Sequence, residues 1–133
     1  MVRAYYLDTS VAGRALLKHS ESAAAWLDET DAEPTSVIVS SRLLQTEITR
    51  MLRRESLPVL LREQLLIGVN LVPISESILR SAEAIGEHVK TLDAIHLATA
   101  MSIDGEVIVV THDKHMASVA ASLGMAAFDP VND

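Results

Sequence analysis

The chain has 133 residues, of which 49% are apolar, and a formal net charge of −7. This length suits one domain with one core, and charged residues interrupt every apolar run before it reaches the ~20 residues that a membrane-spanning helix needs. Because the sequence has no cysteine, disulfides, thiol nucleophiles and thiolate metal sites are excluded, and a metal would need oxygen or imidazole ligands. The acidic charge argues against nonspecific nucleic-acid binding, unless acids surround a cation or basic residues share one face.

Short strand-like runs alternate with helix-like segments along the chain. This pattern predicts an α/β fold: a single three-layer domain over residues 1–133, with a mostly parallel central sheet of four to five strands flanked by helices. We expect the strands at Ala4 to Leu7, Ser36 to Val39, Asn70 to Val72, Val107 to Val110 and Ala126 to Phe128. No export leader precedes the first strand pattern, so we expect a soluble protein of the cytoplasm without a membrane partner.

Helices fill the intervals between strands, and residues suited to capping stand at their expected ends. The expected first residues or N-caps are Ser40 or Ser41, Ser75 and Thr91, with Pro58 in the first turn of a further helix. Left-handed glycines are expected to end three helices, at Gly68, Gly105 and Gly124. The tail after Phe128 is predicted to fray.

Two aspartates directly follow predicted strands. Asp8 comes after the first strand, and Asp113 follows the strand Val107 to Val110 within Thr111-His112-Asp113. Ligands of open α/β sheets bind at the carboxyl ends of the strands, but aspartate is also a favoured helix N-cap. The sequence leaves both roles open for each residue. If the two strands are neighbours, the aspartates converge on one crevice.

Glu47 lies within the apolar stripe of a helix predicted from about Ser41 to Arg54. Its spacing of three or four residues from apolar neighbours directs it toward the core. A carboxylate there is costly unless it is paired, protonated or bound to a metal. The alternatives are therefore an ion pair, with Arg50 or Arg14, and a metal site.

Asp93 belongs to the segment Leu92 to Ala100, which predicts a helix that is apolar on almost every face and therefore buried. It falls in the first turn, where free amide groups and the helix dipole favour a negative charge. The dipole accounts for an acid at this place. It does not account for an ionisable group at the buried end of a helix that has no other charge before Asp104.

Four carboxylates in one place would repel one another unless a cation lies between them. Mg²⁺ and Mn²⁺ prefer hard oxygen ligands, and Mg²⁺ usually keeps several waters, which leaves room for a phosphodiester. Such an ion activates water as a nucleophile and stabilises charge on the phosphorus oxygens. The four acids therefore predict metal-dependent hydrolysis.

Three short segments and one further acid occur in an order and spacing that together form a specific signature. They are Leu7-Asp8-Thr9-Ser10, Leu92 to Ala100, Val110-Thr111-His112-Asp113, and Glu47 within Thr46-Glu47-Ile48. Through them the whole chain resembles the PIN domains of the VapC toxin type. The resemblance implies a catalytic acidic quartet of Asp8, Glu47, Asp93 and Asp113 that binds Mg²⁺ or Mn²⁺, directly or through water, with Thr111 holding a water or an acid in place.

The resemblance also implies an activity and partners. The implied activity is that of a metal-dependent endoribonuclease, the toxin of a type II toxin–antitoxin pair. The implied partners are an RNA substrate, for which transfer RNA is one candidate, a cognate antitoxin and a second copy of the chain in a homodimer. The departures lie outside the quartet, since aromatic residues make up only 3% of the chain and His115-Met116 replaces an acidic or aromatic residue of many relatives. They bear on the choice of substrate.

Basic residues near these segments are candidates for contact with substrate phosphates. We assign this role to Arg14, Lys18, Arg50 and Lys114, and also to Arg53 and Arg54, with a solvated surface as the alternative.

Three histidines and one apolar segment also lie near these motifs. We expect His96 to be buried and hydrogen-bonded rather than part of a mixed carboxylate–imidazole site. We expect His112 and His115 in exposed loops. The apolar segment Leu57 to Ile67 suits either core packing or a partner contact.

Two other classes of function are weighed against the nuclease. A catalytically silent PIN-like module that binds RNA or protein would show a broken quartet, and this quartet is complete. A receiver or a haloacid-dehalogenase-type phosphatase needs paired acids near the first strand, whereas Asp8 is followed by Thr9 and Ser10. The metal-dependent ribonuclease is therefore the leading prediction.

Overall fold

Five parallel strands form one sheet in the order β3-β2-β1-β4-β5. The computed structural model describes residues 2–133. It has the strands at Arg3–Leu7 (β1), Ser36–Ser41 (β2), Asn70–Val72 (β3), Val107–Val110 (β4) and Ala126–Phe128 (β5). All five predicted strands are present, although β1 begins one residue earlier and β2 ends two residues later than expected. The sheet is wholly parallel, which confirms the predicted α/β class.

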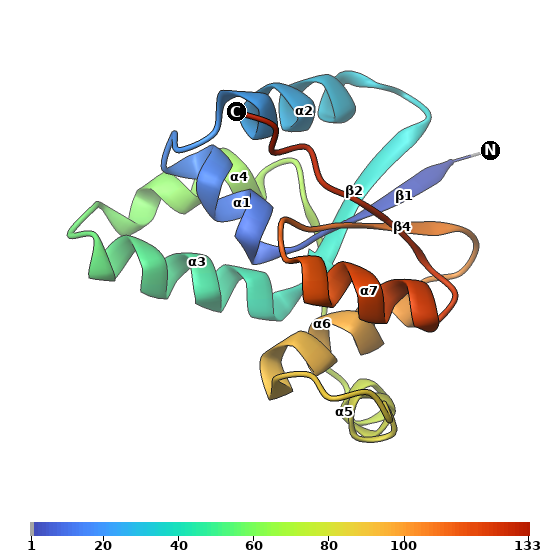
Figure 1. The fold of residues 1–133 in the computed structure, drawn as a ribbon. Coiled ribbons are helices and arrows are strands. Elements are labelled where there is room, and N and C mark those ends of the chain that lie inside the picture. Colours follow the sequence, from blue (N-terminus) through green and yellow to red (C-terminus); the bar gives the residue numbers. More distant parts are fainter. Residues whose placement is uncertain (1) are drawn as a thin grey trace.

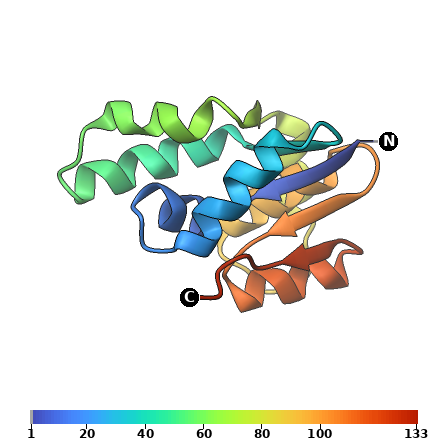
Figure 2. The same cartoon turned by 90° about the horizontal axis from the view of Figure 1, so that it is seen from above.

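Helices cover both faces of the sheet, so that the molecule has three layers (Figures 1 and 2). One face carries α1 (Thr9–Leu16), α2 (Glu21–Ala32), α3 (Arg42–Arg54), a short 3-10 helix (Val59–Leu61) and α4 (Arg62–Leu66). The other face carries α6 (Thr91–Met101) and α7 (Lys114–Ser122), with α5 (Glu76–Glu83) packed on α6. Within residues 2–133, no helix is both long enough and apolar enough to cross a membrane.

Alternate residues of β1 supply the two cores on either side of the sheet. Ala4 and Tyr6 pack against α6 and α7, whereas Tyr5 and Leu7 pack against α1, α2 and α3. This alternation is the period of two that a strand imposes on its side chains. Both faces of β1 are therefore buried, and the residue that follows it emerges at the edge of a fully covered sheet.

The strand order reverses between β1 and β4, because the chain moves from β1 to β2 on one side and returns through β4 on the other. Leu7 pairs with Val110 in the register, and the amide of Asp8 donates to the carbonyl oxygen of Val110 at 2.9 Å. In open α/β sheets a ligand crevice lies at such a reversal, beyond the carboxyl ends of the strands.

Some helix starts were predicted correctly and others were not. Ser41 and Ser75 cap α3 and α5 by accepting from the amides of Leu43 and Ile78 at 3.0 and 3.1 Å. The prediction for Thr91 was wrong, because the cap position of α6 is Lys90, whose side chain makes no capping bond. Pro58 likewise occupies the position before the 3-10 helix and not its first turn. A Lys or Pro cap has no side-chain acceptor to signal it in the sequence.

Of the three glycines predicted to end helices in the left-handed conformation, only Gly124 does so, directly after the C-cap of α7, whereas Gly105 is left-handed but follows the C-cap of α6 by three residues. Gly105 and Gly124 have φ angles of 85° and 88°. Gly68 does not have a positive φ. It instead allows a close approach, since a Cβ built there would lie 2.8 Å from Oδ1 of Asp31.

The end of the chain does not fray as predicted. The Asp133 carboxylate accepts from the hydroxyls of Ser20 and Ser22 at 2.7 and 2.8 Å and from the amide of Glu21 at 2.8 Å. These bonds tie the tail to the start of α2, and Figure 1 shows the carboxyl terminus beside that helix. They also hold the pKa of Asp133 well below its usual value.

Candidate functional site

The carboxyl ends of β1 and β4 bring Asp8 and Thr111 together. The hydroxyl of Thr111 donates to Oδ2 of Asp8 at 2.8 Å, and the hydroxyl of Ser10 donates to the same oxygen at 2.6 Å. Asp8 occupies the N-cap position of α1, but its side chain makes no capping hydrogen bond. The side chain is buried, with 5% exposure, and bonds to Thr111 after β4 and to the Ser10 side chain, with no bond to a backbone amide of α1. The simple N-cap interpretation is therefore wrong for Asp8.

Asp113 has the opposite arrangement. Its Oδ1 accepts from the amides of His115 and Met116 at 2.9 and 3.1 Å, so it caps α7 from an exposed position. Its own amide donates to the Thr111 hydroxyl at 3.1 Å. Thr111 therefore links the two strand-end aspartates through a single oxygen atom.

Glu47 faces the core side of α3, as its place in the apolar stripe predicted. Its Oε1 accepts from the Thr9 hydroxyl at 2.8 Å and contacts Nε2 of His96 at 2.5 Å. The alternative of an ion pair with Arg50 or Arg14 was wrong, because among residues 2–133 the basic partner of Glu47 is His96 and neither arginine bonds to Glu47. Burial by itself would raise the pKa of Glu47, but the hydrogen bond and charge of His96 and the Thr9 hydroxyl outweigh it, so the pKa is lowered.

His96 is buried and uses both ring nitrogens, as expected for a hydrogen-bonded core histidine. Its Nδ1 lies 2.6 Å from the Tyr6 hydroxyl, which accepts from the amide of Ser41 at 3.1 Å. Burial raises the pKa of Tyr6, so the phenol keeps its proton. Nε2 of the same ring contacts Oε1 of Glu47. His96 therefore orients Glu47 and has no free nitrogen for a metal.

Asp93 lies in the first turn of α6 and is half-buried. Within residues 2–133 its carboxylate accepts no hydrogen bond, in contrast to the other three acids. Burial raises its pKa, as do the charges of Asp8, Asp113 and, to a smaller degree, Glu47, against an opposing effect of His96. The four predicted acids therefore share one electrostatic neighbourhood.

The oxygen atoms of this cluster suit a hydrated divalent cation. Asp8, Glu47 and Asp113 receive their hydrogen bonds on Oδ2, Oε1 and Oδ1 respectively, so one oxygen of each carboxylate is left over. In the part of the chain that the structure describes, no three acidic or imidazole side chains are grouped closely enough to hold an ion directly. Mg²⁺ commonly uses one or two carboxylates and keeps its waters. The residues thus fit an ion held directly by at most two acids, with the others reached through water.

The structure separates the predicted basic residues. Arg14 donates to the carbonyl oxygen of Ser10 at 2.7 Å and stands beside the acids, and Lys114 follows Asp113 directly. Arg50 is exposed on α3. Lys18 follows the carboxyl end of α1 and lines a different cavity, so the structure does not bring it to the acids.

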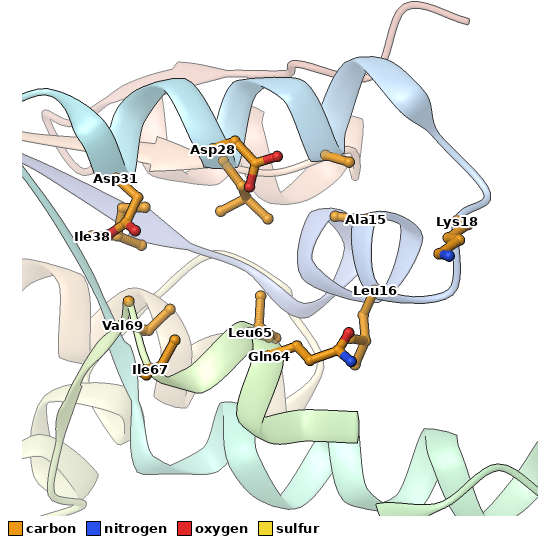
Figure 3. Close-up of a pocket in the computed structure, with 13 residues that line it drawn as sticks. Ala15, Leu16, Lys18, Asp28, Asp31, Ile38, Gln64, Leu65, Ile67 and Val69 are labelled. Atoms are coloured by element: carbon orange, nitrogen blue, oxygen red, sulfur yellow. The ribbon is translucent and has the colours of Figure 1, made fainter. Parts of the chain in front are cut away.

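That different cavity, of about 240 Å³, lies between α1, α2 and α4 (Figure 3). Its wall is largely apolar, with Leu16, Ile38 and Leu65 among the side chains shown. Asp28 and Asp31 add negative charge at its α2 side. None of the four acids of the quartet lines it.

The remaining histidines have partners of their own. His112 contacts Oδ2 of Asp129 at 2.9 Å, and Nε2 of His115 donates to the backbone oxygen of His88 at 2.7 Å. His115 is the second residue of α7, so the prediction of a loop was wrong for it.

Sequence reasoning missed three residues that shape the site. Thr9 and Ser10 hold Glu47 and Asp8 through their hydroxyls, and Tyr6 holds His96. The hydroxyls of Thr9 and Ser10 directly follow Asp8, which was a usable signal. Tyr6 gave none, because strand alternation marks it only as a core residue.

Comparison with known proteins agrees with this fold. The family model of the PIN domain matches residues 5–122. Ribonuclease VapC47 of Mycobacterium tuberculosis (strain CDC 1551 / Oshkosh) is 30% identical over 131 residues, which cover 94% of this chain and 96% of that protein.

Two solved structures have the same fold at low sequence identity. VapBC2 from Rickettsia felis, bound to a DNA fragment from their promoter, superposes with a TM-score of 0.74 at 14% identity, over 95% of this chain and 98% of that one. A toxin–antitoxin complex from Klebsiella pneumoniae gives a TM-score of 0.71 at 22% identity, over 97% and 99% of the two chains. The match over most of the chain, together with the VapC relative, shows that this protein belongs to the PIN domain family, as its resemblance to the VapC type predicted.

Proposed function

We propose that this protein is a Mg²⁺- or Mn²⁺-dependent endoribonuclease of the VapC type and the toxin of a toxin–antitoxin pair. The observation that supports the proposal most is the link of Asp8 and Asp113 through the Thr111 hydroxyl at the reversal of strand order, where each of these carboxylates keeps one oxygen free of protein partners. The bond of Glu47 to Thr9, and the charges of Asp8, Asp113 and Glu47 that help to raise the pKa of Asp93, favour the inclusion of the other two acids. The name of the relative, a ribonuclease, supports the same reaction class. We further propose that residues 1–133 act as one functional unit in the cytoplasm.

In this proposal Asp8, Glu47, Asp93 and Asp113 hold the ion, in part through its waters. When bound, Mg²⁺ or Mn²⁺ supplies positive charge to the phosphate oxygens and makes water a stronger nucleophile. Ser10 and Thr111 keep Asp8 in one orientation, because both donate to the same oxygen and leave the other turned away from them. Thr111 is thus a positioning residue.

The charges of the acids are set by their neighbours. The lowered pKa of Glu47 keeps this carboxylate ionised over a wide pH range. The raised pKa of Asp93 reflects repulsion from the other acids, which a cation between them would relieve. The protein therefore holds a negative site that favours a divalent ion.

The direct test measures cleavage of total RNA with added Mg²⁺ or Mn²⁺ and uptake of Mn²⁺ by calorimetry. We expect cleavage that EDTA abolishes, and loss of both cleavage and Mn²⁺ uptake in Asp93→Asn. Asp104→Asn, an equal change of charge in the exposed turn after α6, is the matched control and should behave as the wild type. Cleavage and Mn²⁺ uptake that persist unchanged in Asp93→Asn would rule out the proposal.

The proposal includes partners: an RNA substrate such as transfer RNA, a cognate antitoxin, and a second copy of the chain. The similar structures are described as VapBC2 and as a toxin–antitoxin complex. Leu60 and Ile67 of the apolar segment Leu57 to Ile67 are 78% and 90% exposed, while Leu65 is buried, so this segment offers surface to a protein partner as well as core packing. Co-expression with the adjacent small reading frame should yield a co-purifying complex with suppressed cleavage, and sizing of the free protein tests the homodimer.

A further inference from the structure

A second cavity adjoins the acids through Thr9 and Ser10, which line it and bond to Glu47 and Asp8. This cavity lies between α1 and the end of α3, has a volume of about 300 Å³, and is lined in part by Thr9, Ser10, Gly13, Arg14, Met51 and Arg54. This volume is at the lower end of the range for small-molecule sites in proteins, which suits a ligand of about one nucleotide.

The wall between this cavity and the acids is only one side chain thick. Thr9 and Ser10 line the cavity, and their hydroxyls donate to Glu47 and Asp8 at 2.8 and 2.6 Å. A strand of RNA whose scissile phosphate lies at the acids would therefore place a neighbouring nucleotide at this cavity.

The charge of the cavity is favourable for phosphate, in contrast to the net charge of the whole chain. Arg14 is held in place by its bond to the carbonyl oxygen of Ser10 at 2.7 Å, which leaves its other guanidinium donors available. Arg54 makes no ion pair with any side chain of residues 2–133. Two guanidinium groups at one cavity are a suitable fork-shaped donor set for a phosphate.

The remaining lining is suited to the nucleoside part of a nucleotide. Leu17 and Met51 provide apolar surface, and Glu55 provides an acceptor for ribose hydroxyls or base amino groups. Met51 lies directly over α1, since a Cβ built at Gly13 would be 2.5 Å from its Cε and 2.8 Å from its Sδ. The absence of a Cβ at Gly13 thus allows the end of the Met51 side chain to lie against α1.

We propose that this cavity is a subsite for one nucleotide of the RNA next to the cleaved bond, with Arg14 and Arg54 binding its phosphate and Met51 contacting the base or sugar. The proposal rests on the proposed ribonuclease function and deepens it. It selects Arg14 and Arg54 from the predicted basic residues by their place at one defined cavity, and it gives Gly13 and Met51 a part in binding.

The test uses adenosine 3′,5′-bisphosphate and its guanosine, cytidine and uridine counterparts as probes, in EDTA so that no metal is needed. Binding is followed through the methyl resonances of the five methionines, with Met51 assigned by Met51→Leu. We expect a saturable shift of the Met51 resonance, with Met101 and Met125 unchanged. Arg14→Ala and Arg54→Ala should each weaken binding roughly tenfold or more, as expected for lost charge-assisted hydrogen bonds.

Two further variants separate the cavity from general charge. Arg80→Ala removes an exposed arginine of α5, which lies away from α1 and α3 (Figure 1), and should bind as the wild type does. Gly13→Ala favours the helix and displaces the flexible end of Met51 into the cavity, so it should fold and bind the probe more weakly.

The subsite is ruled out if Arg14→Ala/Arg54→Ala binds the bisphosphates as tightly as Arg80→Ala, even where the wild type cleaves RNA. A different result would overturn the nuclease function. The wild type would bind the bisphosphates and these variants would not, but the wild type would cleave no RNA with metal present, which would leave only a nucleotide site. The two failures are therefore distinguishable.

Discussion

The turns after β1 and β4 start from the same local pattern and reach different structures. Each places an aspartate at the N-cap position of the following helix, Asp8 before α1 and Asp113 before α7. Asp113 caps its helix from an exposed position, whereas Asp8 is buried and bonds to Ser10 and Thr111. The two aspartates differ because hydroxyl groups surround Asp8, and not because of the strand ends that they follow.

This difference shows that a capping position need not be used for capping. The helix α1 begins without a side-chain acceptor from Asp8, and it packs chiefly against α2 and α3. The Asp8 carboxylate is thereby available for a ligand, while Asp113 divides its two oxygens between helix and site.

The largest expected effect is the loss of RNA cleavage in Asp8→Asn, which we compare with the loss in Asp113→Asn. We expect Asp8→Asn to lower cleavage roughly a thousandfold, because a buried ligand charge is lost, with thermal stability little changed. Asp113→Asn should lower cleavage less, since this acid is exposed and already bonded to two amides. Rate measurements with RNA and Mn²⁺ test this order, and equal losses would show that the two turns are functionally equivalent.

A second variant, Thr111→Val, removes the atom that joins the two turns. The change leaves the amide of Asp113 without its acceptor and Asp8 without one of its donors. We expect unfolding to become easier by about 1–3 kcal/mol and cleavage to fall roughly tenfold to a hundredfold. Denaturant unfolding and kinetics measure the two effects, and Thr111→Ser, which keeps the hydroxyl, should restore most of both.

A smaller effect is expected on helix stability alone. Asp113→Ala removes the cap of α7 and should lower the free energy of unfolding by about 1 kcal/mol. Asp8→Ala removes no cap from α1, so hydrogen exchange of the first amides of α1 should not increase as it does in α7. Faster exchange at the start of α1 in Asp8→Ala would show that Asp8 does cap this helix.

The smallest effect concerns Asp93 and pH. Because its pKa is raised above the usual 3.8, its ionised form opposes folding, and this cost appears as pH rises through the two pKa values. In the absence of metal we therefore expect Asp93→Asn to melt at a slightly higher temperature than the wild type at neutral pH. The two proteins should converge at low pH, and screening by solvent keeps the difference small. A neutral-pH melting point below that of the wild type would contradict the placement of the four acids in one field.

Much of the fold could be predicted because it depends on local periodicity. Short strand-like runs between helix-like segments marked the five strands, and serine caps marked the starts of α3 and α5. The inward direction of Glu47 also followed from helical spacing. Three predictions failed because they depend on contacts that are distant or unmarked in the sequence. Gly68 packs closely on Asp31, and the cap position before Thr91 is a lysine without a side-chain acceptor. The tail after Phe128 bonds to the start of α2.

The partners within the site could not be predicted for the same reason. Glu47 bonds to His96, which is 49 positions away in the sequence, and not to Arg50 or Arg14. Tyr6 bonds to that histidine from 90 positions away. Nothing in the spacing of single residues encodes such contacts, whereas the strand ends near Asp8 and Asp113 are encoded by the strands themselves.

The central place of β1 in the sheet has a consequence for synthesis. The strand that leaves the ribosome early acquires its second neighbour, β4, only after about a hundred further residues, and the hydroxyl that orients Asp8 belongs to Thr111, 103 positions later. A partly translated chain thus holds the first acid of the site with only Ser10 of the two hydroxyls that position it. We therefore expect nascent fragments to lack the proposed nuclease activity until nearly the whole domain has emerged.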